Sequence, residues 1–207
     1  MIINPSELSH SDRYKLVIGA VLPRPIAWVS TMDSNGTLNV APFSFFTAVC
    51  REPMTLLFCP GYSPQKEGKK DTLRNIEALP EFVINLVNEE VAEAMNLTSA
   101  ILPHGQSEFE YAGLTAAPSE TIQVPRVAEA PIAYECKLQR IVTVSDQPGG
   151  GSVVFGEVQR IHIQDDIYQD GYILLEAYKP IGRLGGKGYV RVTDTFEMER
   201  PIVSSKA

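Results

Sequence analysis

The chain has 207 residues, of which 44% are hydrophobic and 21% are charged, as is usual for a globular protein. Twenty-five acidic residues against eighteen basic ones give a net charge of −7, which disfavours nucleic-acid binding because such binding draws on a basic face. The cysteines, Cys50, Cys59 and Cys136, are too few and too widely spaced to indicate a disulfide framework or a zinc site, and Cys50 and Cys59 are expected to be small buried hydrophobes.

A single domain over residues 1–207 is the natural interpretation of this length. The N-terminus has no basic segment followed by an apolar run, and no stretch approaches the roughly 18 apolar residues of a membrane span. We therefore expect a cytoplasmic protein without membrane contacts.

The first predicted element is a short helix within residues 7–16, where the hydrophobic periodicity is mixed. We expect it to pack against the rest of the fold, with Leu8, Tyr14 and Val17 facing inward.

A hairpin follows. Residues 26–31 are rich in β-branched and aromatic side chains and predict a strand, residues 34–36 tolerate the positive φ of a tight turn, and a return strand is expected over 37–46. Pro42 cannot donate a ladder hydrogen bond, so it indicates an edge strand or a bulge. Polar side chains beside bulky aromatics at the strand ends suit a flat aromatic ligand with polar edges.

Prolines bound a predicted buried strand over 53–60, and residues 71–79 predict a helix because apolar residues recur every three positions. Asp71 or Thr72 is expected to cap the first turn of this helix.

Residues 102–131 contain several prolines and little periodicity, which predicts a long surface excursion of a length that is usually functional or interfacial. The remaining predicted elements are strands at 81–87, 132–146 and 152–164 and a helix at 89–100. The last two strands flank a glycine-rich hairpin turn at 147–151. These elements predict a mainly β barrel with helical covers and a polar tail.

Lys69, Lys70, Asp71 and Thr72 stand at the head of a predicted helix. Unpaired N–H groups there favour anions, and Lys70 with the Thr72 hydroxyl would complete a phosphate seat. The alternative is a solvated lysine pair beside an ordinary helix start.

Arg24 lies between two prolines, which give its backbone a defined direction. It is either a surface ion-pair partner or a ligand contact. The glycine-rich, basic segment 183–189 is neither a P-loop nor a G-x-G-x-x-G fingerprint, so a Rossmann dinucleotide site is not expected.

The three histidines give no metal-ligand spacing, and no metal is predicted. His104, on the long excursion, is a candidate for lining a substrate pocket, whereas His162 alternates within a strand and reads as structural and His10 as superficial. The sequence shows no Ser-His-Asp or Cys-His arrangement, so it does not identify catalytic residues.

Four blocks in order resemble the flavin reductase-like family: PRPIAWVST from Pro23, NVAPFSFF from Asn39, KKDTLRNI from Lys69 and RLGGKGY from Arg183. The resemblance implies an FMN-binding split β-barrel with a few covering helices, forming a homodimer with two flavins near its interface.

The resemblance also implies a site. Residues 69–72 would border the FMN phosphate with Ser44 as a second donor, and Arg24 would lie near the phosphate or the ribityl chain. The hydroxyls of Ser30 and Thr31 and exposed main chain would meet the pyrimidine edge of the flavin. The alternative for Ser30 and Thr31 is that they simply prepare the turn. The alternative for Tyr189 is a core or interface tyrosine. The implied cofactor contacts are Arg24, Ser30, Thr31, Ala41, Pro42, Phe43, Ser44, Lys69, Lys70, Asp71, Thr72 and Tyr189.

The implied activity is oxidoreduction, in which NADH or NADPH reduces bound flavin and electrons pass to free flavin, oxygen, a metal chelate or a redox partner protein. The alternatives are a flavoredoxin-like electron carrier without a nicotinamide site and a flavin-binding protein for storage or sensing. The long excursion and the tail after Tyr189 are expected to cover the open face of the flavin and slow its exchange.

Overall fold

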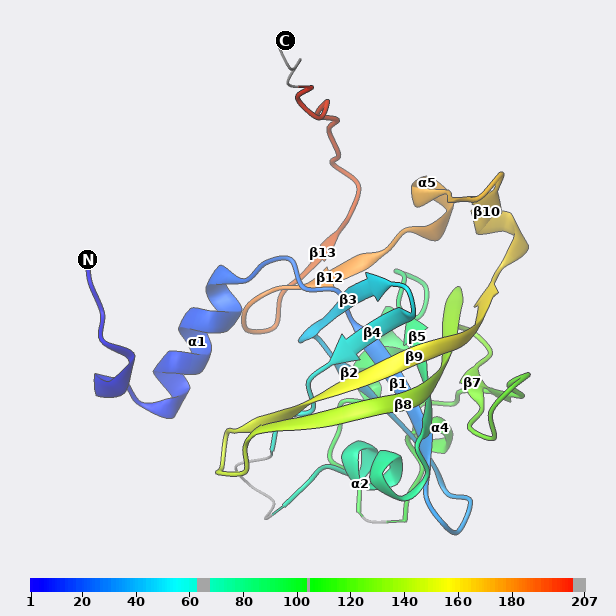
Figure 1. Cartoon of the computed structure of the whole chain (residues 1–207), viewed down its shortest axis with the longest axis horizontal. Coiled ribbons are helices and arrows are strands. Elements are labelled where there is room, and N and C mark those ends of the chain that lie inside the picture. Colours follow the sequence, from blue (N-terminus) through cyan, green and yellow to red (C-terminus); the bar gives the residue numbers. More distant parts are fainter. Residues whose placement is uncertain (63–67, 104, 203–207) are drawn as a thin grey trace.

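The computed structural model describes residues 1–62, 68–103 and 105–202 (Figure 1). Seven antiparallel strands form one curled sheet in the order β2-β1-β5-β8-β9-β4-β3. The strands are β1 (Ala27–Met32), β2 (Leu38–Phe43), β3 (Phe46–Arg51), β4 (Met54–Phe58), β5 (Glu81–Leu86), β8 (Ile132–Ser145) and β9 (Gly151–Ile163). The two edge strands, β2 and β3, follow each other in the chain through Ser44 and Phe45. This seam is where the barrel is open.

Short elements cover the sheet and its ends (Figure 1). The helices are α1 (His10–Ala20), α2 (Asp71–Ala78), α3 (Ala92–Leu97), α4 (Glu108–Tyr111) and α5 (Leu175–Tyr178), with 3-10 turns η1 (Pro5–Glu7) and η2 (Asp165–Ile167). Three small ladders pair β6 (Ala116–Ala117) with β7 (Arg126–Val127), β10 (Tyr168–Gln169) with β11 (Tyr172–Ile173), and β12 (Ile181–Arg183) with β13 (Tyr189–Arg191). None of the described helices is long and apolar enough to cross a membrane.

The predicted β1–β2 hairpin is confirmed, with Ala27 opposite Phe43 and Trp28 opposite Pro42. Gly36 supplies the positive φ of the turn at +86°. Pro42 lies on the edge strand β2, where its missing N–H costs no central ladder bond. The predicted extent of the return strand is wrong, because β2 ends at Phe43 and Phe46 begins the separate strand β3.

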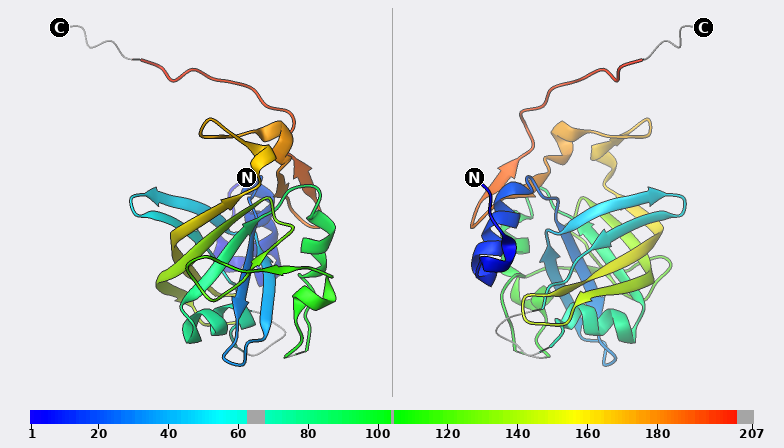
Figure 2. Two further views of the ribbon diagram at one scale, coloured as in Figure 1. Left: turned by 90° about the vertical axis from the view of Figure 1, so that its right-hand side faces the viewer. Right: turned by 60° about the vertical axis from the view of Figure 1, so that its left-hand side comes forward.

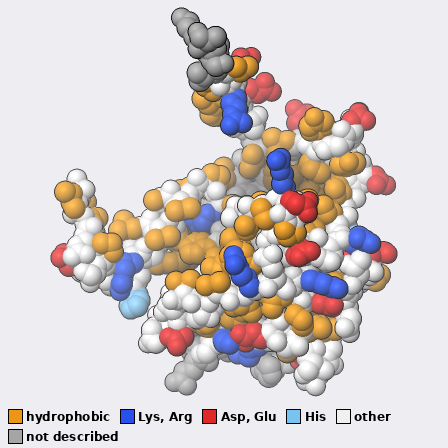
Figure 3. Space-filling view, in the orientation of Figure 1, with side chains coloured by type: hydrophobic (Ala, Val, Ile, Leu, Met, Phe, Trp, Pro, Cys, Tyr) orange, Lys and Arg blue, Asp and Glu red, His pale blue; other side chains and the backbone are white. Residues whose placement is uncertain are grey.

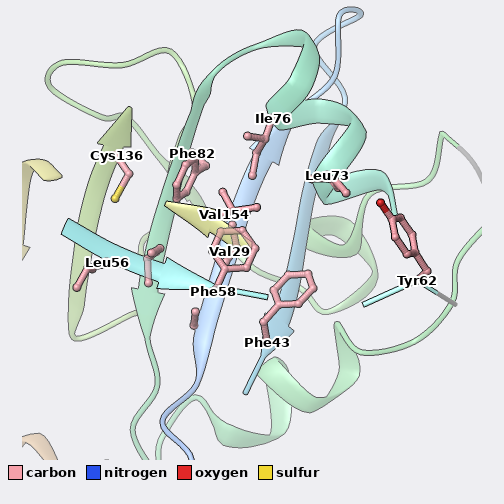
Figure 4. Packing of buried hydrophobic residues seen from close by; sticks show 12 residues of the cluster. Val29, Phe43, Leu56, Phe58, Tyr62, Leu73, Ile76, Phe82, Cys136 and Val154 are labelled. Carbon is pink, nitrogen blue, oxygen red and sulfur yellow. The ribbon is translucent and has the colours of Figure 1, made fainter. Parts of the chain in front are cut away.

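The main core is built around three aromatic rings from three strands (Figure 4). Phe58 lies between Phe43 and Phe82, with ring centroids 5.1 and 5.6 Å away. On β9, Gly156 leaves room for the Phe82 ring, since a Cβ there would lie 2.4 Å from Phe82 Cζ. Trp28 points to a second cluster, where it is fully buried and its Nε1 donates to Thr98 Oγ1 at 2.9 Å.

The predicted packing of the first helix is wrong. Helix α1 begins at His10, where Ser9 accepts from the Asp12 amide as N-cap, and it projects from the body (Figure 1). Only Ile18 of this helix is buried, and Tyr14 remains 60% exposed. The helix meets the fold near its C-terminal end and at His10, whose Nδ1 lies 3.4 Å from the position of a Gly149 Cβ, and most of its apolar side chains are uncovered.

Helix α2 is confirmed, but its predicted cap is wrong. The N-cap is Lys70, which makes no side-chain capping bond, and Asp71 and Thr72 lie inside the helix. The second predicted helix, over 89–100, is reduced to α3. Cys50 was expected to be buried, but it is exposed because β3 is an edge strand.

The long excursion over 102–131 packs against the sheet and is anchored by a fully buried carboxylate, Glu135 on β8. Glu135 Oε1 accepts from the Glu120 amide and from His162 Nε2, each at 2.6 Å. Its Oε2 accepts from the Thr121 amide at 2.8 Å and from Thr121 Oγ1 at 2.5 Å. The structural role expected for His162 is thus confirmed, and the excursion is held in one place.

Candidate functional site

The seam between β2 and β3 meets the start of α2 at Lys70. The Lys70 ammonium lies 5.3 Å from the centroid of the Phe43 ring, at the end of β2. Partial removal from water lowers the pKa of this ammonium. Within the described part of the chain, no hydrogen bond or ion pair engages Lys70 Nζ, so its charge is available to an anion.

The neighbours of Lys70 are already engaged. Lys69 Nζ pairs with Glu77 at 2.5 Å, and Arg74 donates to Asp71. The amides of the first turn of α2 add positive potential beside Lys70. Of the predicted phosphate seat, Lys70 and the helix start therefore fit a bound anion best.

Arg24 is a buried structural cation. Its Nη1 donates to the carbonyl oxygens of Ile18 and Val21 at 2.8 and 2.9 Å, and its Nη2 donates to that of Leu184 at 2.9 Å. Its Nε donates to Ser44 Oγ at 3.2 Å. Burial lowers the pKa of the guanidinium. Arg24 therefore links the C-terminal end of α1 and the loop at Leu184 to the seam. Its Nε, Nη1 and Nη2 groups all donate to acceptors within the protein.

The hydroxyls of Ser30 and Thr31 also have protein partners. Ser30 Oγ donates to the Pro125 carbonyl at 2.7 Å and accepts from Asn85 Nδ2 at 3.3 Å. Thr31 Oγ1 accepts from Asn75 Nδ2 at 3.1 Å. Both residues have no exposed surface, so in this conformation they tie β1 to its neighbours and do not reach a ligand.

Thr72 belongs to a buried network that sequence reasoning missed. Its Oγ1 donates to Asn39 Oδ1 at 3.3 Å, and Asn39 Nδ2 donates to Glu108 Oε2 at 2.8 Å. Burial raises the pKa of Glu108, although the Val40 amide also donates to this carboxylate. An asparagine within a predicted strand was the one signal that could have pointed to this network.

A polar cleft borders the same network. Asp33, Asp71 and Glu108 are among the residues that line it. Three carboxyl groups make this cleft unsuited to a phosphate, so the candidate position for an anion is on the Lys70 side of the helix start.

The main chain at Ala41 and Pro42 remains accessible. Both residues are half-buried on β2, which is an edge strand and therefore leaves backbone polar groups outside the ladder. Ser44 follows at the seam, where its hydroxyl accepts from Arg24. The ring of Phe43 belongs to the core, and the Lys70 ammonium lies over one face of this ring.

Tyr189 is the first residue of β13, which lies well away from the start of α2 (Figure 1). Its hydroxyl donates to Asn96 Oδ1 at 3.2 Å, and the Arg183 guanidinium carbon lies 4.6 Å from its ring centroid. Arg183 also donates to the Gly186 and Gly188 carbonyls, which closes the glycine-rich loop on itself. His104 lies outside the described residues.

A second, apolar cavity of about 300 Å³ opens beside β12. Its wall includes the prolines at 23, 25 and 180, and Phe46, Ile181 and Val192. Tyr178 also lines it, and burial raises the pKa of this phenol. We refer to this space as the β12 cavity.

A curled antiparallel sheet left open between β2 and β3 defines a split barrel, and the Lys70 ammonium lies at its seam beside the Phe43 ring. Residues 19–181 match the flavin reductase like domain, and the chain belongs to the flavin reductase-like family. Sequence and structure thus agree on the family that the four sequence blocks indicated.

Solved structures resemble the whole chain. Nitrilotriacetate monooxygenase component B from Bacillus cereus is 39% identical with a TM-score of 0.91, over 96% of this chain and 98% of that one. The 2-nitrobenzoate 2-nitroreductase NbaA of Pseudomonas fluorescens is 35% identical with a TM-score of 0.88, over all of both chains. A putative flavin reductase with a split barrel domain from Shewanella frigidimarina, 22% identical over 97% and 100% of the two chains, shares the fold at a TM-score of 0.82.

Proposed function

We propose that the protein is an FMN-binding flavoprotein that acts as an NAD(P)H-dependent flavin oxidoreductase, passing electrons from nicotinamide through bound FMN to free flavin or another acceptor. The observation that carries the proposal is the Lys70 ammonium, which lies 5.3 Å from the centroid of the Phe43 ring and has no hydrogen-bond or ion-pair partner among the described residues. Family membership supports a flavin, and the names of the similar solved proteins from B. cereus and P. fluorescens support redox chemistry.

The residues at the seam fit FMN in two respects. Lys70 and the first turn of α2 would hold the phosphate, because a cation beside a helix N-terminus is a favourable anion site. The main chain at Ala41 and Pro42 would meet the polar edge of the flavin ring. Arg24, Ser30, Thr31 and Thr72 would act one layer behind, by fixing the strands and the helix that carry these groups.

FMN supplies the electron-transfer chemistry when it is bound, and the chain supplies binding and orientation. The site therefore needs no protein acid or base at the reacting atoms. The seam agrees with this, because it presents Lys70, the main chain of β2 and aromatic side chains. An electron carrier without nicotinamide activity would use the same seat, and only reduction by NADH or NADPH separates the two functions.

Replacing Lys70 with alanine tests the seat. We expect Lys70→Ala to weaken FMN binding by about 1–3 kcal/mol, which is roughly 5-fold to 150-fold in Kd, because a charge-assisted contact to the phosphate is lost. The measurement is a titration of FMN fluorescence with flavin-free protein.

Lys69→Ala is the matched control, since Lys69 is paired with Glu77 and its removal should change the Kd by less than about twofold. Equal affinities of wild type and Lys70→Ala would remove Lys70 from the site and return it to the solvated surface.

A further inference from the structure

The C-terminal arm, residues 193–202, extends away from the body (Figure 2). Its apolar side chains alternate with polar ones, and Phe196, Met198 and Ile202 are 84%, 83% and 94% exposed. Period-two alternation is the pattern of an extended segment with one buried edge. Burial of exposed apolar side chains is favourable, so the apolar edge of the arm would be stabilised by contact with a partner surface.

The arm does not use its own body as that surface. Across the described residues, no hydrogen bond joins the arm to any other part of the chain. The last anchor is the Val192 amide, which donates to the Pro180 carbonyl at 3.1 Å. Beyond this bond every residue of the arm is exposed.

The β12 cavity lies at the root of the arm, because Val192 is part of its wall. The cavity is lined mainly by apolar side chains, with Arg24 and Tyr178 also in its wall, and its volume of about 300 Å³ exceeds what one large side chain fills. Phe196 is four residues beyond Val192 and so lies at most about 14 Å from it along an extended chain. In a contact with two-fold symmetry, each copy presents the same surface to the other. Because Phe196 and the β12 cavity lie close together on one copy, such a contact can place Phe196 of each copy in the cavity of the other.

Charge favours the same pairing. Residues 177–193 contain Lys179, Arg183, Lys187 and Arg191 and no acidic residue, and of these Arg191 is already paired with Glu89. The arm that follows contains Asp194, Glu197 and Glu199 against the single cation Arg200. An acidic arm laid across the basic β12–β13 ladder of another copy brings opposite charges together at the rim of the cavity.

Helix α1 adds area to this contact. The loop between β12 and β13 lies against it, with the position of a Gly185 Cβ only 3.5 Å from the Ile18 carbonyl. Hydrophobic side chains gather between α1 and the body on the face shown in Figure 3. Tyr14 and Val17 on α1, and Val21 directly after it, are exposed. A stable interface buries roughly 800 Å² on each partner, which a short arm reaches only together with such a neighbouring face.

We propose that two copies of this chain exchange their C-terminal arms, with Phe196 of each copy seated in the β12 cavity of the other. The second copy is the occupant of both the cavity and the exposed stripe of α1. Arm exchange gives the homodimer expected from the family resemblance a specific anchor.

The first test is sedimentation equilibrium of wild type and Phe196→Asp. We expect wild type to be a dimer and Phe196→Asp to raise the dimer dissociation constant at least tenfold, because a carboxylate would be placed in an apolar cavity. Tyr111→Asp is the matched control, since Tyr111 is an exposed aromatic on α4, at the other end of the molecule (Figure 1), and should leave the constant unchanged. A monomeric wild type, or equal constants for wild type and Phe196→Asp, would overturn the proposal.

The second test asks whether the cavity is filled. A chain truncated after Val192 should bind the apolar dye anilinonaphthalene sulfonate at least fivefold more strongly than wild type, with an unchanged circular dichroism spectrum. Equal dye binding would mean that the cavity is open in wild type, and would contradict arm exchange. Neither readout involves flavin, so the arm and the FMN seat are tested independently.

Discussion

Glu135→Gln is expected to lower the free energy of unfolding by about 3 kcal/mol at pH 7. Burial alone would raise the pKa of Glu135, but hydrogen bonds from Glu120, Thr121 and His162 outweigh it and lower the pKa to about 2. A difference of about 2.5 pKa units from the ordinary value corresponds to about 3 kcal/mol. Glutamine keeps one acceptor oxygen, but its amide group faces donors, which leaves buried N–H groups unpaired.

The sign of the pH dependence follows from the depressed pKa. The carboxylate stabilises the fold fully above its unfolded pKa, and this contribution is lost as the pH falls from about 5 to about 2. Wild type should therefore lose stability steeply over that window, and Glu135→Gln should lose about 3 kcal/mol less over it. Urea unfolding followed by circular dichroism at a series of pH values gives both quantities.

Glu120→Gln is the control for this prediction. Glu120 stands in the same loop, but its side chain is exposed and only its amide contacts Glu135. We expect its stability to lie within about 0.5 kcal/mol of wild type. A Glu135→Gln protein as stable as wild type, with the same acid transition, would show that the excursion is not anchored by this carboxylate.

Arg24→Ala is expected to cost about 3–5 kcal/mol of unfolding free energy in the flavin-free protein. The substitution removes four hydrogen bonds from a buried cation and leaves the carbonyls of Ile18, Val21 and Leu184 without their donor. Arg24→Lys should recover only part of the loss, because an ammonium lacks the planar fork that reaches acceptors on three segments.

The comparison of stability with FMN affinity separates the two roles considered for Arg24. A structural role predicts a large loss of stability in the absence of flavin, measured by urea unfolding. Arg13→Ala, an exposed arginine on α1, should change stability by less than about 0.5 kcal/mol. Wild-type stability of flavin-free Arg24→Ala together with weak FMN binding would instead make Arg24 a ligand contact.

Elements with local signals could be predicted from the sequence. The β1–β2 hairpin rests on a turn with Gly36 at positive φ, and β8 and β9 are joined through a turn with Gly149 at φ +81°. Helix α2 follows from apolar residues three positions apart, since Leu73 and Ile76 are both buried. In each case the residues that fix the conformation are neighbours in the chain.

Strand β3 was missed because the seam carries no turn residue of its own. The run from Ala41 to Phe46 reads as one apolar strand, and the break at Ser44 and Phe45 comes from the curl of the whole sheet. The exposure of α1 was missed because the mixed periodicity of this segment does not tell whether the same chain covers its apolar side chains.

Sequence reasoning could name candidate site residues, but it could not tell which of them have partners within the protein. The hydroxyls of Ser30, Thr31 and Thr72 were assigned to a ligand because their protein partners are distant in sequence. Ser30 bonds a carbonyl 95 residues away, and Asn39 bonds a carboxylate 69 residues away. Such pairs form only when the fold closes, so a polar side chain in a strand looks the same whether it will meet a ligand or another strand. Lys70 is different, because its ammonium has no hydrogen-bond or ion-pair partner in the part of the chain that the structure describes.

The most direct test of the proposed function is an absorption spectrum of the purified protein with FMN, followed by anaerobic addition of NADH and then NADPH. We expect flavin bands near ~450 nm to remain with the protein after gel filtration and to bleach rapidly with at least one of the two donors. Bands that persist under both donors would contradict the nicotinamide-linked activity and favour an electron carrier. A protein that retains no flavin at all would contradict the assignment of the seam as an FMN site.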